Sequence, residues 1–174
     1  PAEGGPKSLD NFELGEAGRM IYKFIWDEFC DWYIELTKAR LYDKENERAK
    51  NTALYVLSYV LEHTLRLLHP FMPFLTEEIW QKVPHDGQWK SIMIADWPTA
   101  DEALCDDAAE AQMTAIMETM KTVRNLRAEV GAAPGHKSEV MLHFTESSLR
   151  PVFAENEGYL KALAAAEPVT LLAD

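Results

Sequence analysis

The stretch Leu65-Arg-Leu-Leu-His-Pro-Phe-Met-Pro-Phe-Leu-Thr-Glu-Glu-Ile-Trp80 decides the fold. A helical pattern of apolar residues leads up to His69. Pro70 ends it, because proline clashes with the preceding turn and disfavours helical backbone in the residue before it. Pro73 adds a second break shortly afterwards. The stretch therefore predicts a long helix that ends in a sharp double-proline corner.

A short helix is expected to follow the corner. Thr76 is a good N-terminal cap, and Glu77 and Glu78 then fall in the first turn, where acidic side chains suit the helix dipole. This pattern is more typical of a fixed bend than of a binding site. The aromatic side chains of the stretch are expected to point inward: Phe71, Phe74 and Trp80.

Two long helices are predicted before the corner. The first begins near Asp10 or Asn11 and ends near Tyr42, since its apolar residues recur every three or four positions. The second follows Asn46, which can cap it, and its broad apolar face indicates packing on more than one side. The apolar stripe of the first helix comprises Ala17, Ile21, Phe24, Ile25, Phe29, Trp32 and Leu36.

The segment 26–38 mixes aromatic and acidic residues within the first helix. Its aromatic residues Trp26, Phe29 and Trp32 are expected in the core. Its acidic residues recur at every fourth position, on one polar stripe, and either pair with Arg66 or Lys38 or remain solvated. These acidic residues are Asp27, Asp31 and Glu35.

The pattern changes after the corner. An extended apolar segment is expected over 89–97. A third long helix is expected from Thr99 or Asp101 to Val130, with Gly131 as its stop. Alternating residues over 139–145 then predict a strand. The remaining elements are expected to be short helices over 148–155 and 157–166 and a strand over 168–172.

We therefore expect a mainly α fold. A linker is expected over 1–10, a helical bundle over 11–131, and a small α+β unit of strand, helix, helix and strand over 132–174.

The charge of the chain restricts where nucleic acid can bind. A net charge of −12 is unfavourable for an RNA-binding protein, which gains affinity by neutralising phosphates. The negative charge is unevenly distributed along the sequence, however, since no Lys or Arg occurs over 91–120. Segments 40–50 and 121–127 are locally more basic. Any RNA contact is expected on those segments.

Signatures of catalysis are missing from the sequence. It holds no Gly-rich phosphate loop and no nucleophile elbow. His63 and His69 are six residues apart and fall on different helix faces, so no metal-binding histidine pair is expected. Cys30 and Cys105 are interpreted as reduced residues of a cytosolic protein, with a disulfide as the less favoured alternative. No apolar run of about eighteen residues occurs, which excludes a membrane-spanning helix.

The stretch Lys121-Thr-Val-Arg-Asn-Leu-Arg127 places basic residues on one helical face. Such a stripe can bind phosphates. It can equally complement the helix dipole near a C-terminus. On the residues alone, the two interpretations are evenly balanced.

These stretches together resemble the C-terminal region of class I aminoacyl-tRNA synthetases for branched aliphatic amino acids. The corner from His69 to Trp80 resembles their shared anticodon-binding domain. The resemblance covers the chain from about Asn11 onward. The stretches that point to the valine enzymes in particular are Trp26-Asp-Glu-Phe-Cys-Asp-Trp-Tyr-Ile-Glu35, Ser91-Ile-Met-Ile-Ala-Asp-Trp-Pro98 and Val123-Arg-Asn-Leu-Arg-Ala-Glu129.

The resemblance implies a function. Enzymes of this family join valine to its tRNA using ATP, and their helical bundle meets the anticodon stem-loop, whose unpaired bases can be splayed out and read at their edges. The family's catalytic His-Ile-Gly-His-like and Lys-Met-Ser-Lys-Ser-like motifs do not occur here, nor does its editing domain. The chain is therefore expected to bind valine tRNA without charging it. It is expected to hold no catalytic residue, metal or cofactor, with ATP belonging to the parent enzyme.

The resemblance also predicts the partners of the chain and the family segments that it lacks. The helix that precedes the Asn11 region in the family, and the coiled-coil arm that follows Asp174, are expected to be missing. The expected partners are the anticodon stem-loop of valine tRNA and the parent catalytic domain. We expect the chain to be monomeric and cytoplasmic.

Basic residues of both segments are the candidates for contact with RNA. The alternative is a helical scaffold that braces the catalytic domain without touching RNA, which the acidic segment 91–120 favours locally. Arg48 and Lys50 are weaker candidates. The main candidates are Lys38, Arg40, Lys121, Arg124 and Arg127.

Overall fold

The structure is a computed structural model that describes residues 14–42, 45–85, 87–133 and 135–172. Contacts divide the chain into two compact units, Pro1–Glu102 and Ala103–Asp174. The bundle was predicted to end at residue 131, whereas the contacts place the third long helix with the terminal unit. The reason is that this helix packs on the short helices that follow it. The linker expected over 1–10 lies outside the described residues.

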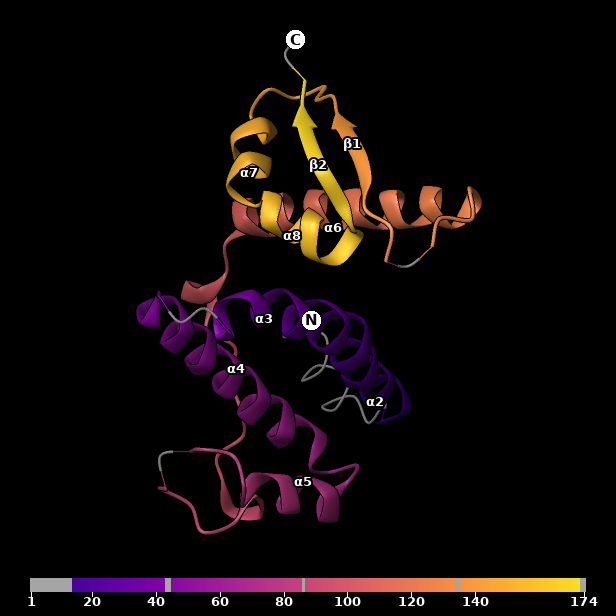
Figure 1. Cartoon of the computed structure of the whole chain (residues 1–174). Coiled ribbons are helices and arrows are strands. Elements are labelled where there is room, and N and C mark those ends of the chain that lie inside the picture. The colour runs from indigo at the N-terminus through magenta and orange to yellow at the C-terminus, as the bar shows by residue number, and fades with distance from the viewer. Residues whose placement is uncertain (1–13, 43–44, 86, 134, 173–174) are drawn as a thin grey trace. The chain divides into compact units, whose positions relative to one another are not determined.

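The N-terminal unit begins with one continuous helical segment made of α2 (Leu14–Lys23), η1 (Phe24–Ile34) and α3 (Glu35–Leu41) (Figure 1). The predicted end near Tyr42 is confirmed, since Tyr42 is the C-terminal cap of α3. The start predicted near residues 10–11 lies outside the described residues.

The middle part of this segment, η1, is a π-helix, in which each hydrogen bond spans one residue more than in an α-helix. The wider turns break the 3.6-residue period on which the core prediction rested. Phe29 and Trp32 are buried, as predicted, but the prediction for Trp26 was wrong, because its side chain is 50% exposed.

Helix α4 (Glu47–Leu68) follows a short connection. Its predicted cap is confirmed, because the side chain of Asn46 accepts a hydrogen bond from the backbone N–H of Ala49 at 3.0 Å. The helix ends just before Pro70, as the sequence predicts.

The double-proline corner leads into α5 (Pro73–Trp80). This helix begins at Pro73 and not after Thr76, because proline lacks an N–H that the first turn would leave unpaired. Thr76 lies inside the helix, and its hydroxyl donates to the carbonyl of Met72 at 2.9 Å. Trp80 is fully buried as predicted, but Phe74 is 91% exposed, so its predicted inward position was wrong.

The core of the N-terminal unit forms where α4 and α5 meet the following segment. Leu65, Trp80 and Ile92 are buried against one another. The segment predicted as extended over 89–97 contains a short 3-10 helix, η2 (Ile92–Ile94), which Ser91 caps. Glu77 ties this turn to α5, because its carboxylate accepts from the Ser91 hydroxyl at 2.7 Å.

The C-terminal unit is built on α6 (Asp107–Glu129), preceded by the 3-10 turn η3 (Glu102–Leu104). The helix begins later than predicted because Asp106 is its cap and accepts from the N–H of Ala109 at 2.9 Å. Its predicted stop is confirmed, since Gly131 has a φ of +65°, a conformation that favours glycine.

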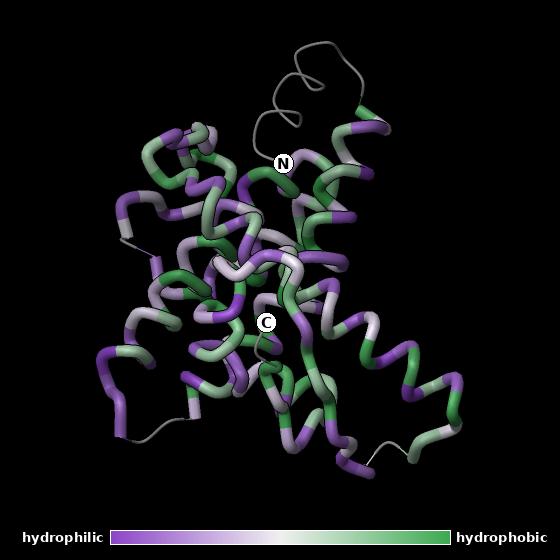
Figure 2. Tube along the Cα trace, turned by 90° about the horizontal axis from the view of Figure 1, so that it is seen from above, coloured by the Kyte–Doolittle hydropathy of each residue, from purple (hydrophilic) through white to green (hydrophobic). Residues whose placement is uncertain are grey.

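The rest of this unit has the predicted order of strand, helix, helix and strand: β1 (Ser138–Leu142), α7 (Leu149–Glu155), α8 (Glu157–Ala164) and β2 (Ala166–Leu171). The strands are parallel, so the two helices supply the crossover that parallel pairing requires. Figure 2 shows hydrophobic and hydrophilic residues alternating at short intervals along the helices, the pattern of amphipathic helices. The predicted mainly α fold is confirmed.

Candidate nucleic-acid interface

The predicted basic residues of the N-terminal unit surround the connection between α3 and α4. Lys38 and Arg40 are exposed on α3, and Arg48 and Lys50 are exposed near the start of α4. Residues two apart on a helix are separated by about 200° of rotation. The members of each pair therefore leave their helix on opposite sides. Lys38 also pairs with the Glu35 carboxylate at 2.6 Å.

One face of α4 carries basic and aromatic residues together. Arg48, Tyr55, Tyr59, His63 and Arg66 recur at helical spacing on one side of the helix. The rings of Tyr55 and Tyr59 are stacked with centroids 6.3 Å apart. The rings of Tyr59 and His63 lie closer, at 4.0 Å. This face lies away from the buried side of α4, which holds Ala53, Thr64 and Leu65.

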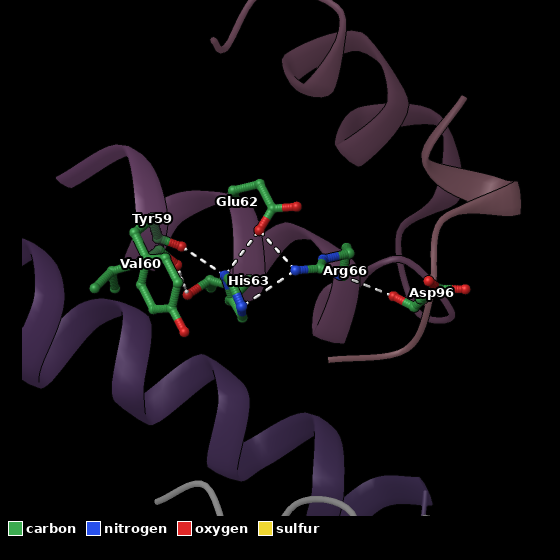
Figure 3. Close-up of polar contacts among 7 residues, drawn as sticks. Tyr59, Val60, Glu62, His63, Arg66 and Asp96 are labelled. Carbon is green, nitrogen blue, oxygen red and sulfur yellow. Dashed lines mark hydrogen bonds and ion pairs between the residues drawn. The ribbon is translucent and has the colours of Figure 1, made fainter. Parts of the chain in front are cut away.

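A network of polar contacts fixes the end of this face (Figure 3). The Glu62 carboxylate accepts from Nη2 of Arg66 at 2.8 Å and lies 2.7 Å from Nδ1 of His63. Arg66 also donates to the backbone carbonyl of Asp96 at 2.9 Å, which ties α4 to the segment after η2. The carboxylate is therefore held in one orientation.

The same contacts define the tautomer of His63. Nη2 of Arg66 lies 3.2 Å from Nε2 of His63. A guanidinium can only donate hydrogen bonds, so Nε2 must be the acceptor. Nδ1 then carries the proton and donates toward the Glu62 carboxylate and the carbonyl of Tyr59, which lies at 2.9 Å.

These residues line an open groove of about 540 Å³, a size typical of ligand sites. The guanidinium carbon of Arg66 lies 5.7 Å from the centroid of the Trp89 ring, within the range of a cation–π contact. The side chains of Arg66 and Glu62 are 11% and 15% exposed. We call this the α4 groove, and define it by Tyr55, Tyr59, Glu62, His63, Arg66 and Trp89.

The α4 groove was not predicted from the sequence, because only the apolar face of this helix was interpreted. The repeated spacing of Tyr55, Tyr59 and His63 was a usable signal. The approach of Trp89, some twenty residues after the helix, was not, because it depends on how the segment after α5 folds back.

The predicted basic residues of the C-terminal unit lie along α6. Lys121 is exposed. Nε of Arg124 donates to the carbonyl of Leu163, near the end of α8, at 2.8 Å. Arg127 donates to the carbonyl of His136 at 2.5 Å and also to the Ser138 hydroxyl. Both arginines thus hold elements of their own unit together. They belong to a different unit from Lys38 and Arg40.

No group of His, Cys, Asp or Glu among the described residues is arranged to hold a metal ion. Cys30 and Cys105 are both free cysteines, one in each unit. Among the helices described, none is both long and apolar enough to cross a membrane.

Comparison with known proteins adds to this geometry. A family described as the anticodon-binding domain of tRNA ligase matches residues 6–142. This chain belongs to that family. The match includes α2 to α6 and β1, so the α4 groove lies wholly inside the anticodon-binding domain.

Curated relatives give the same assignment. The chain is 51% identical to a valine–tRNA ligase of Carboxydothermus hydrogenoformans over 160 residues, which is 92% of this chain and 18% of the relative. It is 44% identical over 168 residues to a valine–tRNA ligase of Bacillus thuringiensis subsp. konkukian, covering 97% of this chain and 19% of that protein. The chain therefore spans about a fifth of the length of the relatives it matches, and corresponds to their anticodon-binding region.

Proposed function

We propose that this chain binds the anticodon arm of valine tRNA as the RNA-recognising part of a valine–tRNA ligase. The match of residues 6–142 to the anticodon-binding domain carries the proposal. The amino acid is proposed from the relatives, which are valine–tRNA ligases. The basic and aromatic face of α4 supports it, because single-stranded RNA is bound by backbone charges together with stacked rings.

The chain is proposed to hold RNA locally and not over its whole surface. With a net charge of −12, affinity must come from a few phosphates bound where the acid is sparse. Lys38, Arg40 and Lys121 are the proposed phosphate contacts, with Arg48 and Lys50 in secondary positions. Arg124 and Arg127, which also donate to backbone carbonyls of their own unit, are proposed as further phosphate contacts.

The chemistry of charging tRNA is proposed to lie elsewhere in the ligase. On this proposal the chain supplies no catalytic group, needs no metal or cofactor, and leaves ATP to the catalytic domain, which is its second partner. The chain is proposed to act as a monomer in the cytoplasm.

A binding experiment tests the proposal. The chain is titrated with a valine anticodon stem-loop and with a leucine one across a series of salt concentrations. We expect tighter binding to the valine stem-loop, with a slope of log affinity against log salt of about −0.7 to −0.9 for each phosphate neutralised. Lys38→Ala and Arg40→Ala should each weaken binding and flatten the slope, by up to about one phosphate. Lys82→Ala is the matched control, because this exposed lysine on the far side of the corner pairs with Glu78.

Two outcomes of this binding experiment would contradict the proposal. If neither stem-loop binds, and the chain instead binds the separated catalytic part of the ligase, the chain is a helical scaffold. If every variant binds RNA with the same affinity and the same salt slope as the wild type, these residues do not contact the RNA.

A further inference from the structure

We infer that the outer edge of β1 binds a further strand, supplied by the part of the ligase that lies outside these 174 residues. The inference rests on the proposed function only in taking the chain to be part of a longer ligase. It adds an interaction surface in the C-terminal unit, one kind of partner, and the backbone groups that bind this partner.

The sheet of the C-terminal unit consists of two strands, β1 and β2. Each strand therefore has one edge that no other strand of the described residues covers. An unpaired edge presents a row of N–H and C=O groups that can pair with another segment of chain. A sheet of two strands is also marginal in stability, and further strands stabilise it. The sheet is thus suited to extension at one of its two edges.

The edge of β2 is protected against such extension. Pro168 of β2 has no N–H to donate, and proline within a sheet is typical of edge strands. The pairing also shows an extra residue on this strand. Ser138 lies opposite Ala166, whereas Val140, two residues later, lies opposite Val169, three residues later. Prolines and bulges are common means of blocking a sheet edge, so β2 is expected to remain the last strand on its side.

The edge of β1 has neither form of protection, because its five residues include no proline and its pairing no extra residue. The N–H of Ser138 donates to the carbonyl of Ala165 at 3.0 Å, and the carbonyl of Leu142 accepts from the residue after β2 at 2.9 Å. Backbone groups of successive residues in a strand point to opposite edges. Those of Glu139 and Met141 therefore point away from β2, toward the outer edge.

A groove of about 500 Å³ lies between this strand and α6. Figure 1 shows α6 extending past β1 on the side away from β2, whereas α7 and α8 lie on the side of β2. Thr122 and Leu126 of α6 line the groove together with Val140 and Met141. The side chains of Leu126 and Met141 are 56% and 64% exposed. A strand paired with β1 would lie about 4.8 Å from it, over this part of α6, and would cover both side chains.

The groove also indicates which kind of strand fits. Successive side chains of a strand point to opposite faces of the sheet, so alternate residues of the added strand must be apolar to contact α6. The ligase itself is a source of such a strand, since this chain corresponds to only 18% and 19% of the two valine–tRNA ligases compared. A strand within the same polypeptide binds at an effective concentration that can reach the millimolar range, an advantage that a separate protein lacks.

Hydrogen exchange of single amides, measured by mass spectrometry with fragmentation, tests the inference. The 174-residue chain is compared with the intact ligase. The amides of Glu139 and Met141 should exchange about 100-fold more slowly in the ligase, because the added strand accepts their hydrogen bonds. The amides of Val140 and Leu142 are internal controls. They point toward β2, so they should be protected to a similar extent in both proteins.

Met141→Pro removes an N–H at the outer edge and leaves the bonds between β1 and β2 in place. In the ligase it should raise the exchange rate of the Glu139 amide to the rate found in the 174-residue chain. Val140→Pro is the matched control, because it removes an N–H that points toward β2. It should instead increase exchange throughout β1 and β2 in both proteins.

A second variant tests the groove without altering the backbone. Leu126→Ser should leave the fold of the 174-residue chain intact, since this side chain is largely exposed there. In the ligase it should speed exchange of the Glu139 amide by about tenfold, because the added strand loses an apolar contact. Leu104→Ser is the control, at a leucine that is 66% exposed and does not line the groove.

Three outcomes would overturn the inference. The first is equally fast exchange of the Glu139 and Met141 amides in the chain and in the ligase. The second is protection that survives both Met141→Pro and Leu126→Ser, which would place its origin elsewhere. The third is protection in the 174-residue chain alone that rises with its concentration, which would assign the edge to a second copy.

These measurements involve no RNA, so they separate the inference from the proposed function. Protection of the outer edge in a ligase whose 174-residue segment binds no stem-loop would leave the inference standing and overturn the proposed function. Binding of the valine stem-loop without protection of the outer edge would do the reverse.

Discussion

Individual arginines in this chain act mainly as braces. Arg66 joins a carboxylate, an imidazole and a backbone carbonyl, and Arg127 joins two backbone carbonyls and a hydroxyl. The guanidinium suits this role because its five N–H donors are fixed in one plane. Lys38 and Lys121 are exposed, and Lys38 pairs with a carboxylate of its own helix, that of Glu35.

This division predicts different effects on stability. Arg127→Ala should lower the free energy of unfolding of the C-terminal unit by about 1.5–3 kcal/mol, because it removes hydrogen bonds that hold the turn after α6. Lys121→Ala, the control, should change it by no more than about 0.5 kcal/mol. All five tryptophans lie before residue 98, so hydrogen exchange of the β1 and β2 amides is the suitable measurement. Equal protection in both variants would show that Arg127 does not brace the unit.

At the scale of elements, one carboxylate connects α5 to the segment that follows it. Glu77 accepts hydrogen bonds from the Ser91 hydroxyl at 2.7 Å, the Gln81 amide at 2.7 Å and the Ile92 N–H at 3.1 Å. These bonds favour the charged form. They lower the pKa of Glu77 below its usual value of 4.5, with the bond from Ser91 as the largest cause.

Acid should therefore loosen this connection. Because the pKa of Glu77 is lowered by folding, its contribution to stability is complete above about pH 4.5 and is lost as the pH falls through the folded-state value. Glu77→Gln should destabilise the N-terminal unit by about 1–3 kcal/mol at pH 7. The difference from wild type should shrink below pH 4.5. Tryptophan fluorescence during urea unfolding measures the free energy of unfolding. Glu78→Gln, at the exposed neighbouring residue, is the control. A difference between wild type and Glu77→Gln that does not vary with pH would contradict the role of the charged Glu77 carboxylate.

The ends of helices were predictable where a single residue nearby determines them. Pro70, Asn46 and Gly131 each act through their own backbone or side chain, and the structure confirms the helix ends they predict. The π-helix was not predictable, because its apolar spacing fits an α-helix as well. The exposure of Trp26, which lies in this π-helix, and that of Phe74 on α5 were not predicted either.

The whole molecule has an uneven charge that should govern how fast RNA arrives. Basic residues are absent over 91–120, a segment that reaches well into α6. Exposed acids there repel an approaching polyanion over distances of about 10 Å at 0.1 M salt. This effect acts on the encounter with RNA and falls off as salt screens the charges.

Removing acid from α6 should therefore speed association. Glu110→Gln combined with Glu118→Gln should raise the association rate with the valine stem-loop by about twofold at low salt, and the gain should disappear at about 1 M salt, where charges are screened. Gln112→Glu, on the same exposed stretch, should act in the opposite direction. Stopped-flow fluorescence measures the rate, and a gain that persists at high salt would mean that the substitutions change the bound state.

The candidate site was predictable only in part at this scale. Family and fold followed from long ordered motifs such as the double-proline corner, and both are confirmed. The basic residues proposed for RNA contact remain predictions. Charge along a sequence shows which segments can attract phosphate, but not which side chains are already occupied, as those of Arg124 and Arg127 are.

The parallel pairing of β1 and β2 has a mechanical consequence. Tension applied between the start of β1 at Ser138 and the end of β2 at Leu171 pulls the strands in opposite directions along their length. Their hydrogen bonds run across that direction, so they share the load together and do not open one after another. A pull between these two points loads the small sheet in shear, its most resistant geometry, whereas a pull on both strands from the same end peels it apart.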